Sequence, residues 1–372
     1  MAAELTERQA LLVLNALPNI GPITTNRLLE ELGGDPCAIF LAGSTRLAAV
    51  KGVGPIIVQT LARWSEHFDL AREEKMLADT GVTFVAAQDE AYPKLLRQIH
   101  DPPIGLYRKG TYAFAHPGVA IVGSRRATLY GQAVAKRLGA ELAERGFCVV
   151  SGLARGIDTA AHEGALSVGG RTAAVLGTGL DLIYPPENLD LYRRIAEAGA
   201  ILSEFPFGRR ADRQSFAMRN RIVSGICEAV VVVETDVDGG AMITARFAGE
   251  QGRLLFAVPG RIDQPSSRGC HQLIRDGATL LTGVDDILAE LNYLDGLRPT
   301  PVPAHSGGRP EGLSEAEQRV LECFRGGSIL NIDALGGLTQ MPAHELGATL
   351  MLLELKRLVV RRVDGAFEAT GC

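Results

Sequence analysis

Six short apolar runs between residues 119 and 260 constrain the fold of this chain of 372 residues more than any other feature. Each run is continuous and does not alternate with polar residues, which is typical of strands buried on both faces of a sheet. Helical patterns separate the runs, and this alternation predicts a layered α/β core with a parallel sheet and right-handed crossovers. The predicted strands are VAIVG, FCVVSG, TAAVLG, AILSEF, AVVVVET and LLFAVPG. The predicted helices are GQAVAKRLGAELAERG, DTAAHEGALSVGG, NLDLYRRIAEAG, RNRIVSGIC and MITARFAGEQG.

Glycines and arginines follow the predicted strands at the points where the strands end. Ligands of such folds bind at the carboxyl ends of the strands, where glycine lets a ligand approach the backbone and helix N-termini attract anions. The spacing after the first strand, GSRRATLYG, is not the dinucleotide fingerprint G-x-G-x-x-G, which argues against a dinucleotide-dependent oxidoreductase. The alternative is that the glycines only form tight turns. The residues predicted to bind phosphate here are Gly123, Ser124, Arg125, Gly152, Arg155, Gly156, Gly239 and Gly240.

A segment rich in arginine, FPFGRRADRQSFAMRNR, precedes the fifth strand as a predicted linker. The net charge of −5 and the pI near 5.9 do not indicate nucleic-acid binding, so such an activity would need a local basic patch. This segment carries five arginines against one aspartate, and its Phe216 could stack on a base. The alternative is a solvated loop with Phe216 anchored in the core. The predicted DNA contacts here are Arg213, Phe216, Arg219, Asn220 and Arg221.

Six ordered motifs within residues 119–283 together resemble the DNA-processing protein A family (DprA, also called Smf). The motifs are GSRRATLYG, SGLARGIDTAAHEGAL, AVLGTGLDLIYPPENLDL, SEFPFG, FAMRNRIVSG and GRLLFAVPG. The resemblance implies an extended Rossmann-like core that binds and protects single-stranded DNA, a homodimer, and loading of the recombinase RecA during natural transformation. The chain departs from the family at Ala217 and Met218, where Pro is usual, and at Gly239-Gly240, where Ser-Gly is usual. Neither change removes a charge.

An enzyme is the alternative reading. The related phosphoribohydrolases of the lonely-guy type use a similar core on nucleoside monophosphates and require P-G-G-x-G-T-x-x-E, whereas this chain has ETDVDGGAMITA at the corresponding place. Ser124 and Ser151 lack the G-x-S-x-G elbow of a nucleophile. Asp158 and His162 share a helix face, but no further ligand has suitable spacing, and Asp158 can cap its helix. We therefore expect no catalytic residue, no metal site and no cofactor.

Composition points to a cytoplasmic protein. The six cysteines are scattered without a C-x-x-C pair, which disfavours a zinc site or a disulfide framework and fits a reducing compartment. No run approaches the roughly 18 apolar residues of a membrane span. The first residues, MAAELTERQA, lack the apolar region of a signal peptide.

The chain is long enough for several domains. Residues 1–70 predict a helical domain in which LPNIGPITTNRLL and VKGVGPIIVQTLA resemble paired helix-hairpin-helix turns, whether for phosphate binding or only for packing. Residues 71–295 form the expected core; its first part, 71–118, predicts a strand, a helix over AYPKLLRQIH and a short strand. VVVVET and MITARFAGEQG are the candidate dimer surface. A Pro- and Gly-rich linker, 296–312, precedes a winged-helix-like domain at 313–372, with a capping box at Ser314 and a hairpin turn at Asp364-Gly365.

Overall fold

The computed structural model describes residues 5–291, 313–324, 330–356, 358–361 and 365–369. These residues fall into two compact units, Met1–Ala304 and His305–Cys372. The predicted linker 296–312, and Asp364 of the predicted hairpin turn, lie outside the described residues. Within the described part of the chain, no helix has the length and apolarity needed to cross a membrane.

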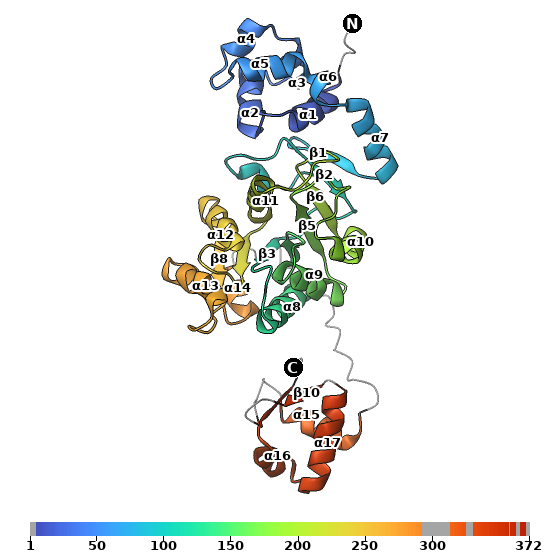
Figure 1. Ribbon diagram of the computed structural model, residues 1–372, viewed down its shortest axis with the longest axis vertical. Coiled ribbons are helices and arrows are strands. Elements are labelled where there is room, and N and C mark those ends of the chain that lie inside the picture. The colour runs from blue at the N-terminus through green and yellow to red at the C-terminus, as the bar shows by residue number, and fades with distance from the viewer. Residues whose placement is uncertain (1–4, 292–312, 325–329, 357, 362–364, 370–372) are drawn as a thin grey trace. The chain divides into compact units, whose positions relative to one another are not determined.

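A nine-stranded sheet forms the centre of the described first unit, in the order β1-β2-β6-β5-β4-β3-β7-β8-β9. Figure 1 shows β1, β2, β6 and β5 in succession. All six predicted strands are confirmed, and the strands from β6 to β9 in this order run parallel. The chain order reverses at β3, which lies between β4 and β7, and such switch points are where α/β folds bind ligands. The parallel strands are β3 (Gly118–Val122), β4 (Cys148–Ser151), β5 (Thr172–Leu176), β6 (Ala200–Ser203), β7 (Ala229–Val232), β8 (Leu254–Ala257) and β9 (Thr279–Leu280).

Alternate residues of each strand point to opposite faces of the sheet, so helices cover both faces. On one face Val119 and Ile121 of β3 pack in a core with α8, α9 and α14, and on the other Ala120 and Val122 pack with α11, α12 and α13. The helices α8 and α9 can approach closely because Gly139 has no Cβ. A Cβ at this position would overlap the backbone of Ala161. The helices of this core are α8 (Leu129–Glu144), α9 (Ile157–Ser167), α10 (Leu189–Ala198), α11 (Arg213–Gly225), α12 (Gly240–Glu250), α13 (Pro265–Arg275) and α14 (Val284–Glu290).

The six apolar runs predict a parallel sheet, but the complete sheet is mixed, because two further strands pair antiparallel at one edge. β2 (Gly105–Lys109) pairs antiparallel with β6, and β1 (Thr83–Ala86) pairs antiparallel with β2, which extends one edge. The predicted helix over AYPKLLRQIH is wrong: only a 3-10 turn, Leu96–Gln98, forms there. The segment lies between prolines and is too short to nucleate a stable helix. β7 lies inside the sheet between β3 and β8, so the VVVVET segment cannot supply the dimer edge considered for it.

Short helices precede the sheet, and the two similar segments have the same local structure. Gly21 and Gly54 are N-caps, and Pro22 and Pro55 are the first residues of the helices that follow, where a missing N–H costs no helical hydrogen bond. The helical structure predicted for residues 1–70 is therefore confirmed at both turns. These N-terminal helices are α1 (Glu7–Ala16), α2 (Pro22–Glu31), α3 (Pro36–Leu41), α4 (Ser44–Ala48), α5 (Pro55–Ala62), α6 (Trp64–His67) and α7 (Leu70–Thr80).

The second unit has the predicted winged-helix architecture. Three helices pack around Val320, Leu335 and Leu350, and a two-stranded antiparallel sheet follows them. The Ser314/Glu317 capping box is confirmed: the Ser314 N–H donates to the Glu317 carboxylate (2.7 Å) and the Glu317 N–H donates to the Ser314 hydroxyl (3.2 Å). The elements are α15 (Glu315–Glu322), α16 (Ile332–Thr339), α17 (Ala343–Leu355), β10 (Val359–Arg361) and β11 (Phe367–Ala369).

Candidate functional site

A pocket of about 610 Å³ opens at the switch point, between the loops that follow β3 and β7. The first turns of α11 and α12 form its other walls, so helix N-termini and strand ends meet there, as in anion sites of this fold class. Most of the predicted site residues come together in this pocket. Those that line it are Gly123, Ser124, Arg125, Gly152, Arg213, Phe216, Arg219, Asn220, Gly239 and Gly240.

Backbone hydrogen bonds to two other segments hold the loop after β3 in place. The Ser124 N–H donates to the carbonyl of Glu234 (2.7 Å), and the Ile157 N–H donates to the carbonyl of Ser124 (3.3 Å). The Ser124 hydroxyl accepts a hydrogen bond from the Arg126 N–H (3.0 Å). These contacts present the guanidinium groups of Arg125 and Arg126 to solvent at the pocket mouth. Sequence reasoning missed Arg126, although it directly follows Arg125 in the same glycine turn.

The helix predicted over RNRIVSGIC is confirmed but starts earlier, at Arg213, so residues 213–218 of the arginine-rich segment are helical and not part of a linker. α11 begins at Arg213 because Asp212 and Ser215 form a capping box: the Ser215 N–H donates to the Asp212 carboxylate (2.7 Å), and the Asp212 N–H donates to the Ser215 hydroxyl (3.0 Å). Arg213, Phe216 and Asn220 recur at helical spacing and line the pocket together. Helical geometry therefore sorts the predicted contacts of this segment onto different faces.

Two aromatic rings lie between two arginines in a row beside the pocket. The Arg125 guanidinium lies over the Phe216 ring, 4.7 Å from its centroid, and the Tyr184 ring lies 5.8 Å from that of Phe216. Arg155 lies 5.8 Å from the Tyr184 ring and also pairs with Glu187. Arg125, Arg155, Tyr184 and Phe216 enclose a smaller adjoining cavity. Sequence reasoning missed Tyr184; the available signal was an aromatic residue in the loop that follows the third parallel strand.

Arg219 lines the pocket, but its guanidinium binds backbone carbonyls of the protein. Its side chain is buried, and its Nη1 donates to the carbonyls of Gly152 (2.6 Å) and Val175 (2.5 Å). Gly152 has to be glycine, because a Cβ there would overlap the Arg219 guanidinium. Burial lowers the pKa of Arg219 to about 10, opposed by the charge of Asp158. Arg219 thus holds the ends of β4 and β5 together.

Asp158 completes this buried arrangement. Its carboxylate accepts the N–H groups of Gly152 (3.1 Å) and Ala154 (3.3 Å), which shapes the loop after β4. Burial raises the pKa of Asp158, and Arg219 opposes that shift. His162 lies deeper, where its Nδ1 is 2.7 Å from the Thr172 hydroxyl, and burial lowers its pKa to about 3. The described residues contain no group of three or more His, Cys, Asp or Glu side chains arranged to hold a metal ion.

Two predicted contacts lie outside both cavities. Arg221 is only 3% exposed; its Nη2 donates to both carboxylate oxygens of Glu204 (2.5 and 2.7 Å), and its Nε lies 3.2 Å from the carboxylate of Asp101. Its charge is therefore satisfied inside the protein. Gly156 has φ +77°, and a Cβ there would overlap the Ser124 carbonyl, so this glycine supports the loop that carries Arg125.

Aspartates offset part of the positive charge that the arginines give to the pocket. Asp236 and Asp238 are exposed at the wall formed by the loop after β7, and Asp158 is buried beside Arg219. The exposed positive charge of the pocket lining comes from Arg125, Arg126 and Arg213.

The comparison with protein-family models decides what this arrangement belongs to. The model described as DNA recombination-mediator protein A matches residues 83–292, which contain the whole mixed sheet and the pocket. The chain belongs to the DprA family. The model of the DprA winged helix domain matches residues 299–365, in agreement with the fold of the second unit.

Relatives and solved structures agree with DprA membership. The chain is 36% identical over 370 residues to the putative DNA processing protein DprA of Mycobacterium tuberculosis, covering 91% of this chain and 92% of the relative. It is 38% identical over 294 residues to protein Smf of Synechocystis, covering 78% and 74%. The X-ray structure of DprA from Streptococcus pneumoniae superposes with a TM-score of 0.66 at 34% identity, covering 77% of this chain and 98% of that one. A DprA structure from Helicobacter pylori, whose title describes a single-stranded DNA binding mode, superposes with a TM-score of 0.52 at 32% identity, covering 57% and 96%.

Proposed function

We propose that this chain binds single-stranded DNA in the switch-point pocket and holds it mainly by its phosphates. One observation carries the proposal: three exposed arginines, Arg125, Arg126 and Arg213, surround an open pocket that also presents the N-terminus of α12 at Gly239-Gly240. Guanidinium groups and helix N-termini both favour a phosphate, and neither reads the base. The single-stranded DNA binding named for the H. pylori relative supports this.

The proposed contacts follow from exposure and position. Arg125, Arg126 and Arg213 would bind phosphates, Arg155 would extend the path past Tyr184, and Phe216 with Tyr184 would stack on bases. Arg219, Arg221 and Gly156 would act by holding the walls of the pocket. The backbone or side chains of Gly123, Ser124, Gly152, Asn220, Gly239 and Gly240 would complete the DNA surface.

We propose that binding protects the strand and passes it to the recombinase RecA in the cytoplasm. A pocket that grips phosphates and leaves base edges largely accessible suits such a transfer, because the recombinase needs the bases for pairing. Residues 71–295 would be the DNA-binding core, with 1–70 before it and 313–372 after it in the sequence as accessory domains. The family description, a DNA recombination mediator, supports this role.

A homodimer is part of the proposal. Two pockets on one particle would engage one strand together and raise its apparent affinity without new contacts. Leu280, on the outermost strand β9, is 46% exposed, so this edge of the sheet offers apolar surface. Light scattering at micromolar concentration should give twice the monomer mass, and a mass of one chain at every concentration would reject the dimer.

We propose a binding role and not a catalytic one. Asp158, the buried carboxylate of the pocket, is occupied by backbone N–H groups and by Arg219, so its environment is that of a structural group. Incubation with nucleoside monophosphates, followed for released base, tests the enzymatic alternative. Release of base that depends on the pocket residues would replace the binding proposal.

The central test compares single-stranded and duplex DNA of the same sequence at two salt concentrations. The full chain should bind the single strand more tightly, because Phe216 and Tyr184 need unpaired bases, and both affinities should fall with salt. Equal affinity for the two forms would contradict stacking. A single-strand affinity that does not respond to salt would contradict phosphate binding.

A further inference from the structure

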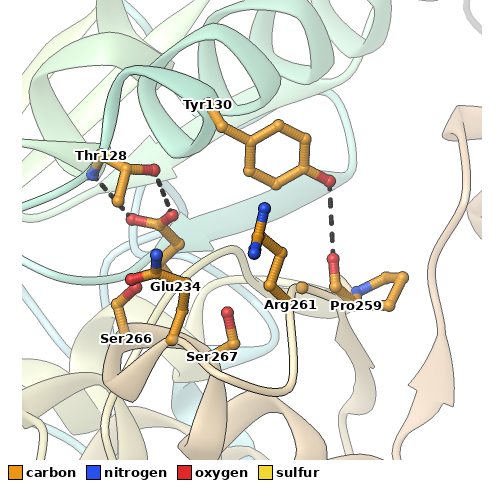
Figure 2. Close-up of a pocket in the computed structure, with 9 residues that line it drawn as sticks. Thr128, Tyr130, Glu234, Pro259, Arg261, Ser266 and Ser267 are labelled. Atoms are coloured by element: carbon orange, nitrogen blue, oxygen red, sulfur yellow. Dashed lines mark hydrogen bonds between the residues drawn. The ribbon is translucent and has the colours of Figure 1, made fainter.

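Glu234, which follows the end of β7, holds both ends of the short segment that joins β3 to α8. At the start of this segment, the Ser124 N–H donates to the backbone carbonyl of Glu234 (2.7 Å). At its end, the Thr128 N–H donates to Oε2 of the Glu234 carboxylate (2.9 Å), and the Thr128 hydroxyl donates to Oε1 (2.5 Å) (Figure 2). One residue of the loop after β7 therefore fixes residues 124–128, which lie far from it in the chain.

The carboxylate of Glu234 completes the N-terminal cap of α8. In a capping box, the N-cap side chain accepts the N–H of the third helical residue, and a Glu or Gln at that third position accepts the N–H of the N-cap. Thr128 is the N-cap of α8 and makes the first of these bonds, from the Gly131 N–H (3.1 Å). Gly131 has no side chain to make the second bond, and Glu234 makes it instead. A tertiary contact thus replaces half of a local cap.

Gly131 leaves open the space that this carboxylate occupies. A Cβ at Gly131 would lie 2.5 Å from Cδ of Glu234 and 2.6 Å from its Oε2, well inside van der Waals contact distance. Glu234 is 4% exposed, and its negative charge lies at the N-terminus of α8, where the helix dipole stabilises it. Glycine disfavours a helix, so a glycine in the first turn of α8 fits a need for this space.

The segment between the two attachments carries Arg125 and Arg126. Both arginines are exposed and line the switch-point pocket. Without the carboxylate, the segment would stay attached at Ser124 but would lose its attachment at Thr128. We infer that Glu234 is a positioning residue of the DNA site, which acts on the strand through Arg125 and Arg126. This inference rests on the proposed function.

Three possible roles of the Glu234 carboxylate predict different effects of its loss. If the carboxylate acted only through its negative charge, its loss would strengthen the binding of phosphates. If it only stabilised the fold, its loss would lower the midpoint of unfolding, and the folded protein would keep its salt dependence of DNA binding. Positioning of the arginines predicts weaker binding with a smaller salt dependence.

Gly131→Ala is the most selective variant. The added methyl group displaces a carboxylate at the end of a flexible side chain, while alanine favours the helix more than glycine does. The helix should therefore persist with the carboxylate moved. Glu234→Gln replaces one acceptor oxygen by a donor. Thr128→Val removes the hydroxyl that donates to Glu234, and Thr128→Ser keeps this hydroxyl as the conservative variant.

The first measurement is the affinity of the full chain for oligo-dT at several salt concentrations. With a slope of about 0.7 for each phosphate contact, three exposed arginines give a fall of about 18-fold between 50 and 200 mM salt. Loss of one or both contacts of the segment should reduce this fall to about 3- to 7-fold in Gly131→Ala, Glu234→Gln and Thr128→Val. Thr128→Ser should keep the wild-type value. Leu129→Ala, 86% exposed and outside the lining of the pocket, is the matched control and should keep it too.

A combination with the arginines tests the route of the effect. In a protein that carries Arg125→Ala and Arg126→Ala, the further change Gly131→Ala should alter the affinity by less than about 2-fold, because the residues through which Glu234 acts are gone. An equal loss in both backgrounds would overturn the inference. Hydrogen exchange without DNA gives an independent readout: the Thr128 N–H should exchange at least about 10-fold faster in Gly131→Ala, the factor expected for one lost hydrogen bond to a carboxylate.

The remaining outcomes separate this inference from the proposed function. Folded variants that keep the wild-type affinity and salt dependence, or that bind oligo-dT more tightly, overturn the inference and leave the proposed function intact. Should Glu234→Gln fail to fold, Gly131→Ala and Thr128→Val give the answer. If the wild-type chain does not bind oligo-dT, the proposed function fails, and hydrogen exchange alone decides whether Glu234 positions the segment.

Discussion

Replacement of Arg125 by Ala gives the most direct test of the switch-point pocket. Arg125 is exposed, follows the loop anchored by the Ser124–Glu234 hydrogen bond, and rests on the Phe216 ring at 4.7 Å. Its removal takes one guanidinium from the pocket and leaves the backbone that shapes it, because the anchoring contacts involve Ser124 and not Arg125. The variant should therefore fold normally and bind DNA less tightly.

The size of the effect follows from the number of exposed arginines. Each phosphate contact with a single strand contributes about 0.7 to the slope of log affinity against log salt, so the three exposed arginines of the pocket contribute about 2.1. Between 50 and 200 mM salt, one such contact is worth about 2.6-fold in affinity and three about 18-fold. Arg125→Ala should flatten the measured slope by about 0.7, equally for every base composition.

Fluorescence anisotropy at four or more salt concentrations measures this slope. Phe216→Ala should cost on the order of 1–3 kcal/mol in binding with little change of slope, because stacking releases no counterions. Since the two side chains touch, the double variant should deviate from additivity by at least about 0.5 kcal/mol. Arg193→Ala is the matched control, because Arg193 is an exposed arginine of α10 outside the pocket. An Arg125→Ala protein that is folded and keeps the wild-type affinity and slope would refute the placement of the site.

Three further predictions concern stability and domain roles. Arg221→Met leaves Glu204 buried without its cation and should lower the free energy of unfolding by about 3–5 kcal/mol in urea titrations; adding Glu204→Leu should recover most of this, and an unchanged midpoint in the single variant would contradict the buried pair. The pKa of His162 is about 3 in the folded protein against an ordinary 6.5, so below pH 6.5 the unfolded chain binds a proton that the folded chain does not. The free energy of unfolding therefore decreases as the pH is lowered. Between pH 7 and pH 5 this amounts to about 2 kcal/mol, which His162→Asn should remove from the pH dependence of unfolding; equal pH dependence in both proteins would argue against it. Deletion of residues 305–372, a separate compact unit, should leave single-strand affinity and salt slope unchanged in the same anisotropy assay, and a large loss would assign DNA contacts to the winged helix.

The parallel core was predictable because burial on both faces leaves a direct mark in the sequence. Runs such as VAIVG have no polar residue, and all six runs form strands. The antiparallel pairing of β1 and β2 leaves no such mark, since the partner of a strand depends on distant residues. The missed start of α11 had a local signal: Asp212 and Ser215 stand in capping-box spacing, although Ser takes the place where Glu or Gln is usual.

Ten of the thirteen predicted site residues line the pocket, because glycine turns at strand ends converge at one edge of a parallel sheet. What the sequence could not separate is the direction in which each arginine points. Arg213 and Arg221 look alike in the arginine-rich segment, yet Arg213 is exposed and Arg221 pairs with Glu204. The place of Tyr184 depends on its contacts with Phe216 and Arg155, which belong to other loops and helices, and spacing alone does not reveal such contacts.

The anchoring of α11 has a consequence for how variants of this protein should be interpreted. Arg219 and Arg221 anchor α11 to the ends of β4 and β5 and to Glu204. Arg213 and Phe216, on the same helix, line the pocket. Loss of Arg213, Arg219 or Arg221 would reduce the amount of folded protein or its affinity for DNA, and a screen that detects only loss of function would score the three variants alike. Only abundance measured beside affinity distinguishes a lost DNA contact from a displaced helix. Phenotypes alone could therefore suggest that all the arginines of α11 contact DNA, although only Arg213, in the first turn of the helix, is exposed in the pocket.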